Sequence, residues 1–351
     1  MTNIAVIFGG DSSEHPISIK TGNFIYNTLD RSKYKLKPIF ITKKGTWLIP
    51  KEFNTVLPTP DKEKDPSENF EREFRELLNP NELPIPFDNM DCEVCVLGLH
   101  GGKGDNGTIQ SLLKLLKLKF TGSDVLASSL AMDKAKSNFI FSSIGLNVAE
   151  FQLVTSEDFF NKSFQLDSSL HYPIFVKPNE GGSSVATGMA RNDSELNLKL
   201  EQVFKEENTA IIQNLVKGTE VSCGVVEYPE SGKFIPTPLF PTEIIPDSEF
   251  FDFTSKYTSG KSNEITPARL EDSVIQEIRN MAVKAHTALG CRGYSRTDFI
   301  IKENKPFILE TNTLPGMTET SLIPQQVKHL KQNMKDILDI LIQNAIKNIH
   351  V

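Results

Sequence analysis

Hydrophobic positions near the N-terminus pass from a continuous run to a helical spacing. Residues 3–8, NIAVIF, are rich in Ile and predict a short buried strand. The turn GGDSSE follows at 9–14, and residues 17–29 can form a helix. Strand, turn and helix in this order are typical of an open α/β sheet, in which ligands bind beyond the strand ends. The glycine spacing is not GxGxxG, so the turn predicts a general anion-binding loop rather than a dinucleotide fingerprint.

Polar positions dominate the next part of the chain. Residues 51–90 are rich in Pro, Glu, Lys and Asn and predict a surface insertion with one charged helix near 68–78. Residues 94–118, VCVLGLHGGKGDNGTIQSLLKLLKL, then predict a strand, a glycine-rich loop and a helix. Thr121-Gly122-Ser123 predicts a hinge into a central domain, and residues 132–141, MDKAKSNFIF, a helix that carries Lys134.

Residues 172–190, YPIFVKPNEGGSSVATGMA, predict a strand that ends near Lys177, followed by a glycine-rich loop. Glycines let a backbone approach phosphate groups closely, and a lysine adds a point charge. Residues 209–227 predict two strands joined by a linker. The polar, aromatic-containing stretch 250–267 predicts an active-site lid, and residues 325–349 an amphipathic helical segment.

Two apolar runs, 299–301 and 307–309, flank the polar stretch 303–305 and predict a β-hairpin. Asp298 lies at the first run, while Glu310 and Asn312 end the second. Residues two apart on a strand share a face, so Glu310 and Asn312 point the same way. A turn with an odd number of residues would place Asp298 on that face, and an even number on the opposite face.

The oxygen atoms of this hairpin suit a hard cation. Carboxylates within apolar strands are costly unless they are paired or bind a cation. Asp, Glu and Asn present the oxygen ligands that Mg²⁺ prefers, and Mg²⁺ is usually completed by substrate phosphates. The hairpin therefore predicts a metal–nucleotide site, with a solvated acidic hairpin as the alternative.

Composition limits the classes of function. The chain has 351 residues, enough for two or three domains, and its net charge of −7 disfavours non-specific nucleic-acid binding. No apolar run approaches the roughly 20 residues that cross a bilayer, and MTNIAVIFGG does not resemble a signal peptide, so we expect a cytoplasmic protein. The four cysteines are too few for a disulfide framework, and the CxxC at Cys92 and Cys95 lies in an apolar run typical of a buried strand.

The stretch from GCRGYSRTDF to LETNTLPGMTETSL, at 290–322, closely resembles the C-terminal signature of the D-alanine–D-alanine ligase family of ATP-grasp enzymes. The resemblance extends in family order over nearly the whole chain. It implies three α/β domains: an N-terminal open α/β domain at 1–122, a central ATP-grasp subdomain at 123–213 and a C-terminal subdomain at 214–351.

The resemblance also implies the residues of an ATP site. Asp298, Glu310 and Asn312 would hold two Mg²⁺ or Mn²⁺ ions. The phosphate contacts would be Lys134, Lys177, Ser183, Ser184 and Lys256, and the contacts to adenine and ribose Gln213, Val216 and Glu220. Typical members carry glutamate where Gln213 stands, and its amide oxygen can still accept from the adenine amino group.

The amino-acid sites follow in the same way. Glu14 would meet the ammonium group of the first D-alanine, with Ser183 and the lid residue Tyr257 in one hydrogen-bonded network. His100 matches a further substrate contact. Arg296 and the Gly316 N–H would stabilise the transition state, and Ser321 and Leu322 would bind the carboxylate of the second substrate. The family usually has two acidic residues where this chain has Asp105-Asn106.

The implied activity is ATP-dependent formation of D-alanyl-D-alanine, a peptidoglycan precursor, through an acyl phosphate. The partners would be ATP, D-alanine and a second copy of the chain in a homodimer, without nucleic acid or membrane. Two alternatives stay open: another ATP-grasp ligase, such as a D-alanine–D-lactate enzyme, or a regulatory protein that binds ATP without ligating. Tyr257 favours the dipeptide, because D-alanine–D-lactate ligases typically lack it.

Overall fold

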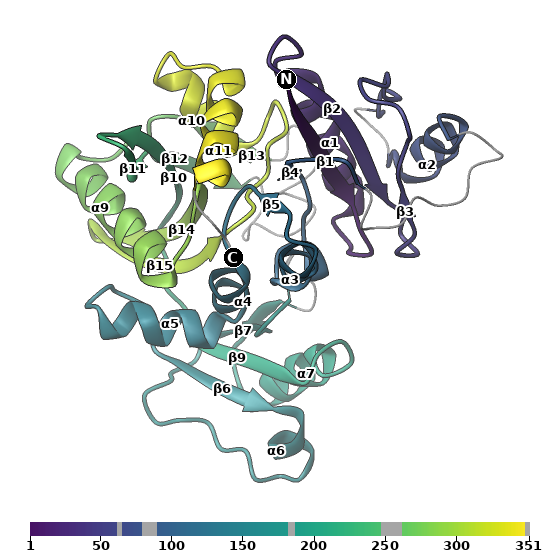
Figure 1. The fold of residues 1–351 in the computed structure, drawn as a ribbon. Helices are drawn as coiled ribbons and strands as arrows, with labels where there is room; N and C mark the ends of the chain where they lie inside the picture. The colour runs from purple at the N-terminus through teal and green to yellow at the C-terminus, as the bar shows by residue number, and fades with distance from the viewer. Residues whose placement is uncertain (62–64, 79–89, 182–186, 247–261, 348–351) are drawn as a thin grey trace.

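The computed structural model describes the chain except residues 62–64, 79–89, 182–186, 247–261 and 348–351 (Figure 1). Three separate sheets organise the described residues, of five, four and six strands. The sheets follow one another along the chain, as the three expected α/β domains require. No helix in these described ranges is long and apolar enough to cross a membrane.

The first sheet has the strand order β3-β2-β1-β4-β5. Its strands are β1 (Thr2–Gly9), β2 (Tyr34–Ile41), β3 (Trp47–Leu48), β4 (Val94–Leu97) and β5 (Lys119–Phe120). All adjacent pairs are parallel except β2 with β3. Helix α1 (His15–Thr28) follows β1, and the short 3-10 helix η2 (Gly102–Gly104) and α3 (Thr108–Leu115) follow β4. The predicted strand, turn and helix at the N-terminus are confirmed.

The 51–90 region contributes to the core of the first sheet. Its expected charged helix is present as α2 (Ser67–Glu76), but Phe70 and Phe74 on one face of α2 are buried. Their rings lie 5.9 and 6.2 Å from that of Phe8 in β1. The prediction of a purely surface insertion was wrong, because two aromatic residues four apart share a helix face and bury it.

The second sheet is antiparallel, with the order β6-β9-β7-β8. Its elements are β6 (Phe151–Thr155), α6 (Ser156–Phe160), β7 (Ile174–Pro178), β8 (Gly188–Ala190), α7 (Asp193–Val203) and β9 (Thr209–Asn214). Strand β7 carries Lys177, as predicted. The linker 215–218 then leads into the third sheet.

The third sheet is antiparallel, with the order β13-β12-β10-β14-β15, and β11 pairs with β10. Its strands are β10 (Thr219–Glu230), β11 (Lys233–Pro238), β12 (Thr242–Pro246), β13 (Ser262–Ile265), β14 (Tyr294–Lys302) and β15 (Lys305–Asn312). Helices α4 (Val125–Met132), α5 (Lys134–Ser143) and α9 (Asp272–Leu289) pack beside it, and Phe141, Leu146 and Ile278 share one core with Phe299 (Figure 1).

Part of the expected lid is a strand. Residues 262–265 form β13, the edge strand that pairs with β12. Among the described residues of the expected lid, only 266 and 267 lie outside a strand. The rest of that prediction, residues 250–261 with Lys256 and Tyr257, lies outside the described residues.

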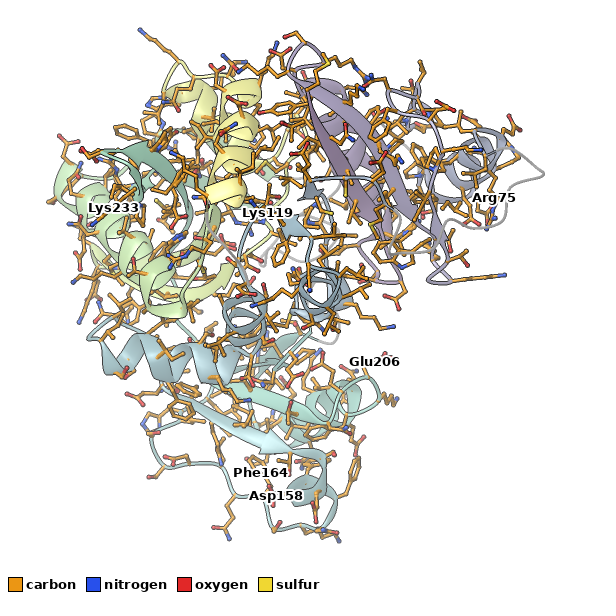
Figure 2. All side chains as sticks on the ribbon, viewed as in Figure 1. Arg75, Lys119, Asp158, Phe164, Glu206 and Lys233 are labelled. Atoms are coloured by element: carbon orange, nitrogen blue, oxygen red, sulfur yellow. The ribbon has the colours of Figure 1, made fainter. Side chains whose placement is uncertain are left out.

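Two helices, not one, end the described chain: α10 (Leu322–His329) and α11 (Met334–Lys347). Lys331, with φ of 58°, lies in the turn that separates them. Ile337, Leu338 and Leu341 of α11 pack into the core of the first sheet. Lys119, labelled in Figure 2, donates from β5 to the Ile346 carbonyl at 2.8 Å. The helical prediction holds, and the break lets α11 reach the N-terminal domain.

The β14–β15 hairpin resolves the open question of which face Asp298 occupies. Its turn has two residues, Glu303 and Asn304, both with positive φ. On its own this even turn would pair Asp298 with Leu309 and direct Glu310 to the opposite face. However, the register shifts between Asp298 and Phe299, so Asp298 pairs with Glu310. A β-bulge therefore brings the two carboxylates onto one face.

Candidate active site

One pocket of about 1510 Å³ lies where the three sheets meet. Its volume exceeds the range typical of drug-sized ligands and suits more than one substrate. Fourteen of the predicted site residues line it: Glu14, His100, Lys134, Lys177, Gln213, Val216, Glu220, Arg296, Asp298, Glu310, Asn312, Gly316, Ser321 and Leu322. Ser183, Ser184, Lys256 and Tyr257 lie outside the described residues. The structure therefore gathers into one pocket every predicted residue that it describes.

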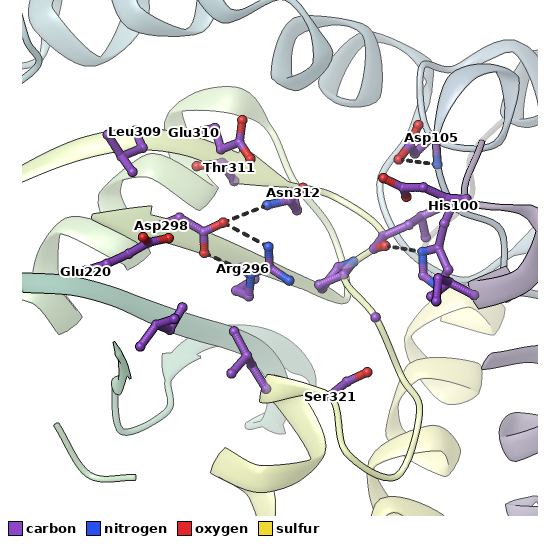
Figure 3. Close-up of a pocket in the computed structure, with 18 of the residues that line it drawn as sticks. His100, Asp105, Glu220, Arg296, Asp298, Leu309, Glu310, Thr311, Asn312 and Ser321 are labelled. Atoms are coloured by element: carbon purple, nitrogen blue, oxygen red, sulfur yellow. Dashed lines mark hydrogen bonds and ion pairs between the residues drawn. The ribbon is translucent and has the colours of Figure 1, made fainter. Parts of the chain in front are cut away.

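The Asp298 carboxylate is bound by four donor atoms, of which those of Arg296 and Asn312 are drawn in Figure 3. Arg296, two residues earlier on the same strand face, donates from Nε to Oδ1 at 2.9 Å and from Nη2 to Oδ2 at 2.8 Å. Ser222 of β10 donates to Oδ1 at 2.5 Å, and Asn312 of β15 donates to Oδ2 at 3.2 Å. Two-pronged pairing with arginine is a strong and directional way to hold a buried carboxylate. The Asp298 carboxylate is thus held in a fixed orientation.

The chemistry of these donors fits a divalent cation that also binds phosphate. Asp298, Glu310 and Asn312 bring two carboxylates and one amide oxygen to the pocket wall. Within the described ranges no group of three or more His, Cys, Asp and Glu could hold a metal alone. Mg²⁺ usually takes one or two protein carboxylates and completes its shell with water and phosphate, a need that Asp298 and Glu310 could meet.

The residues predicted for ATP come from α5, from the second sheet, from the linker and from β10 of the third sheet. Lys134 is the first residue of α5, is nearly buried, and donates from Nζ to the Gly181 carbonyl at 2.6 Å. Lys177 comes from β7. Gln213 comes from the neighbouring strand β9, where it pairs with Phe175 of β7. Val216 lies in the linker, and Glu220 begins β10 beside it. The pocket therefore has Lys134 and Lys177 beside the second sheet, and Asp298 and Glu310 on the third sheet.

Glu14 and His100 form the N-terminal wall. Glu14 immediately precedes α1, and an ideal Cβ at residue 101 would lie 3.5 Å from its carboxyl carbon. Gly101 has a φ of +71°, so a side chain there would be both strained and crowded. His100 is buried, with Nδ1 3.1 Å from the Leu314 carbonyl and Nε2 2.8 Å from the Thr21 hydroxyl.

The protonation of His100 follows from these partners. A carbonyl can only accept, so Nδ1 carries the proton and the Thr21 hydroxyl donates to Nε2. Burial lowers the pKa of His100, and the negative charge of Glu14 offsets this only in part. His100 is thus a neutral imidazole that links α1 to residue 314.

Asp105 is a pocket residue that sequence reasoning did not select. Gly101 N–H donates to its Oδ2 at 3.0 Å, whereas its Oδ1 is buried without a partner among the described residues. Burial raises the pKa of Asp105 to about 7, and the negative charge of Glu14 adds to this effect. Its position in the acidic pair of the family was the available signal, but burial is not visible in a sequence.

Gly316, Ser321 and Leu322 lie together at the start of α10. An ideal Cβ at residue 316 would lie 2.9 Å from the Ser321 hydroxyl, so a side chain there would displace that hydroxyl. The Ser321 hydroxyl accepts from Thr318 N–H at 3.0 Å and lies 2.7 Å from the Thr318 hydroxyl. The backbone N–H groups of this helix start receive no side-chain cap from Ser321. Such a helix start is suited to an anion.

Sequence reasoning also missed Ser222, Glu264 and Gln325. Ser222 holds Asp298, and the other two line the pocket and contact each other. Ser222 lies two residues after Glu220 on β10, so the strand period offered a signal for it. For Glu264 and Gln325, which come from β13 and α10, no local pattern indicates the contact.

Comparison with known proteins agrees with this geometry. A family model described as the N-terminus of D-ala D-ala ligase matches residues 3–123, and one described as its C-terminus matches 140–343. The chain is 46% identical over 350 residues to a D-alanine–D-alanine ligase of Leptospira biflexa, with 98% of each chain covered. It is 35% identical to the enzyme of Flavobacterium johnsoniae, with 99% of each covered.

Solved structures give the same picture of the fold. The VanG D-Ala:D-Ser ligase of Enterococcus faecalis matches with a TM-score of 0.83 at 27% identity, covering 98% of this chain and 99% of that one. A D-alanine–D-alanine ligase of Bacillus anthracis, solved in complex with ATP, matches with a TM-score of 0.73 at 27% identity, covering 99% and 98%. The predicted ATP-grasp architecture is confirmed, and from its pocket, its sheets and its full-length relatives the chain belongs to the D-alanine–D-alanine ligase family.

Proposed function

We propose that this pocket joins two molecules of D-alanine at the expense of ATP, with the residues described above in the roles that their positions suggest. The observation that carries the proposal is the convergence of Asp298, Glu310, Arg296 and Lys134 on one pocket that also contains Glu14. A carboxylate does not react with an amine at neutral pH, because hydroxide is a poor leaving group. Activation by phosphoryl transfer removes that obstacle.

The proposed reaction has two steps. The carboxylate of the first D-alanine attacks the γ-phosphorus of ATP, the bond to the bridging oxygen breaks, and ADP leaves. The amine of the second D-alanine then attacks the acyl phosphate carbon, loses a proton, and expels phosphate. Much of the protein's contribution to such transfers is positioning and neutralisation of charge.

This chain's own side chains supply that positioning. Lys134 and Lys177 neutralise phosphate charge, and Glu14 binds the ammonium group of the first D-alanine. Arg296, held in place by Asp298, and the Gly316 N–H stabilise the oxyanion that forms on the attacked carbon. Ser321 and Leu322 bind the carboxylate of the acceptor. Asp298, Glu310 and Asn312 would hold Mg²⁺ or Mn²⁺, which supplies charge neutralisation between the phosphates.

We also propose that the chain works in the cytoplasm as a homodimer, with domain boundaries at 122/123 and 213/214. Sedimentation of the purified protein tests the dimer, which predicts twice the 39.2 kDa of one chain. The roles of Ser183, Ser184, Lys256 and Tyr257 remain predictions from the resemblance.

Phosphate release tests the proposed function. The protein is assayed with Mg²⁺–ATP alone, with D-alanine, and with D-alanine plus D-serine or D-lactate. We expect release that requires D-alanine and yields the dipeptide. D-serine belongs in the comparison because the VanG neighbour is a D-Ala:D-Ser ligase. ATP binding without D-alanine-dependent release would instead support a regulatory protein, and preference for D-lactate near neutral pH would overturn the substrate assignment.

A further inference from the structure

Residues 313–321, here called the acceptor loop, are held at both ends by side chains from outside the loop. At the first end, His100 donates to the Leu314 carbonyl at 3.1 Å. At the other end, Gln325 donates from Nε2 to the Thr320 carbonyl at 2.8 Å. Gly316, which we assign to the oxyanion, lies between these anchors, and Ser321, which we assign to the acceptor, follows the second one. These two hydrogen bonds supplement the burial of Leu314 and Met317, which pack into the core from the same loop.

The second anchor has a partner of its own. Gln325 Nε2 also donates to Oε2 of Glu264 in the edge strand β13. Both hydrogens of the amide are therefore committed, one to a carboxylate and one to a backbone carbonyl. The carboxylate fixes the orientation of the amide, and this orientation directs the second hydrogen to Thr320. A chain of contacts runs from β13 through Gln325 to the residue that precedes Ser321.

Glu264 belongs to the pocket face of its sheet. It pairs with Ile244, and Ile244 pairs with Glu220, so these three side chains form a row on one face. All three line the pocket. Burial raises the pKa of Glu264, while the Gln325 hydrogen bond and the positive charge of Arg296 act in the opposite direction. Glu264 therefore interacts electrostatically with Arg296, across the same pocket.

The neighbouring Gln326 has a structural role, which contrasts with that of Gln325. It is fully buried, accepts from Gly224 N–H at 2.9 Å, and donates to the Ser222 carbonyl at 2.9 Å. These bonds tie α10 to β10 away from the acceptor loop. Gln325, by contrast, lines the pocket and contacts the loop itself. Gln326 therefore attaches α10 to β10, whereas Gln325 contacts the acceptor loop and lines the pocket.

We propose that Glu264 and Gln325 are positioning residues for the acceptor, holding Thr320 so that Ser321 and Leu322 are in place for the carboxylate of the second amino acid. Neither residue touches the reacting atoms in this proposal. It rests on the proposed function, specifically on the assignment of Ser321 and Leu322 to the acceptor.

The test separates the two half-reactions. Hydroxylamine can intercept the acyl phosphate to give D-alanyl hydroxamate and phosphate, and it has no carboxylate to place at Ser321. In Gln325→Met, which removes both amide hydrogen bonds, we expect the KM for D-alanine as acceptor to rise roughly tenfold. The rate of hydroxamate formation is measured at saturating ATP, with D-alanine sufficient for the donor site but well below its KM as acceptor. Under these conditions it should stay within about twofold of wild type, since that step does not use the acceptor loop.

A charge swap distinguishes positioning of the loop from simple bracing of the sheet. In Glu264→Gln combined with Gln325→Glu, the bond between the two residues can re-form with its direction reversed, but residue 325 can no longer donate to the Thr320 carbonyl. The swap also retains a polar pair and serves if Gln325→Met does not fold. We expect its acceptor KM to remain raised. The matched control is Gln332→Met, whose glutamine instead accepts from Tyr228 at 2.6 Å outside the pocket and should leave both rates unchanged.

Three results would overturn the inference: an unchanged acceptor KM in Gln325→Met, an equal loss of hydroxamate and dipeptide formation, or full restoration by the swap. The first would show that the Thr320 contact is dispensable, the second that the effect is general, and the third that only the link between β13 and α10 matters. Failure of the proposed function looks different, because wild type would then form neither hydroxamate nor dipeptide.

Discussion

Two aspartates line the same pocket in contrasting environments (Figure 3). Asp298 in β14 receives hydrogen bonds from Arg296, Ser222 and Asn312, so both of its oxygens are satisfied. Asp105 in the loop after β4 receives one from Gly101 at Oδ2, and its Oδ1 is buried without a partner in the described part of the chain. The first carboxyl group has donors on both oxygens, whereas burial and the charge of Glu14 raise the pKa of the second to about 7.

The difference shows that two aspartates in one pocket can have different electrostatic properties because their neighbours differ. A carboxylate surrounded by donors is ready to face a cation, whereas a carboxyl group beside another acid retains its proton more readily. The negative charge of Glu14 adjoins Asp105, while the positive charge of Arg296 adjoins Asp298. The wall that carries Asp298 is therefore suited to a metal ion and phosphate. On the wall that carries Glu14, the raised pKa of Asp105 reduces the negative charge.

The largest expected effect removes a carboxylate from the wall that carries Asp298. Glu310→Gln should lower turnover roughly a hundredfold or more, because a lost metal ligand forfeits several kcal/mol of charge stabilisation. Turnover and the Mg²⁺ dependence of ATP binding are the measurements. Glu303→Gln in the turn of the same hairpin is the control and should be silent. Activity of Glu310→Gln within about twofold of wild type would exclude the assigned role.

Asp298→Asn should reduce both stability and turnover, since it leaves the Arg296 guanidinium without its buried counter-charge. Breaking such a pair costs up to about 3–5 kcal/mol, with the lower part of this range expected because the asparagine oxygen still accepts. Urea unfolding measures the loss. A variant as stable as wild type would show that the four contacts to Asp298 contribute little.

Asp105→Asn should act in the opposite direction on stability. The pKa of Asp105 is about 7 in the folded protein against 3.8 for the ordinary group, so the folded state binds the proton more tightly than the unfolded state. Wild type therefore loses stability as the pH rises from about 4 to about 7, and an asparagine removes that loss. We expect the variant to gain roughly 3–4 kcal/mol above pH 7 relative to its difference at pH 4. A pH-independent difference would contradict the assigned environment.

The smallest effect restores the acidic pair of the family. Asn106 accepts from Thr108 N–H at 3.0 Å through Oδ1, a contact that an aspartate can keep. Asn106→Asp should raise the pKa of Asp105 by less than about one unit and change stability by less than about 1 kcal/mol at neutral pH. Carboxyl-group NMR titration of wild type and variant would detect the shift. A lowered pKa would be inconsistent with repulsion between neighbouring acids.

The sequence was informative where the relevant contacts are local. The alternation of β15 placed Glu310 and Asn312 on one face, and strand β1 with its following turn and helix formed as predicted. Which face Asp298 occupies could not be decided, because the two-residue turn and the bulge shift the register in opposing ways. A bulge depends on the whole hairpin and leaves no simple signature in composition.

Contacts between distant segments were the part that sequence reasoning could not reach. Phe70 and Phe74 were read as part of a surface insertion because their partners in β1 and β2 are far away in the chain. The contact of Gln325 with Glu264 joins residues 61 positions apart, and the raised pKa of Asp105 depends in part on the charge of Glu14, which is distant in the chain. Such features arise from tertiary packing, which local propensity does not encode.

The central claim is that this pocket activates the carboxylate of D-alanine as an acyl phosphate. The most direct test uses D-alanine labelled with ¹⁸O in its carboxylate, with Mg²⁺–ATP, followed by mass analysis of the released phosphate. The carboxylate oxygen that attacks the γ-phosphorus stays with phosphate when the peptide bond forms, so the account predicts one labelled oxygen in phosphate for each dipeptide. Unlabelled phosphate, or release that does not depend on D-alanine, would contradict it.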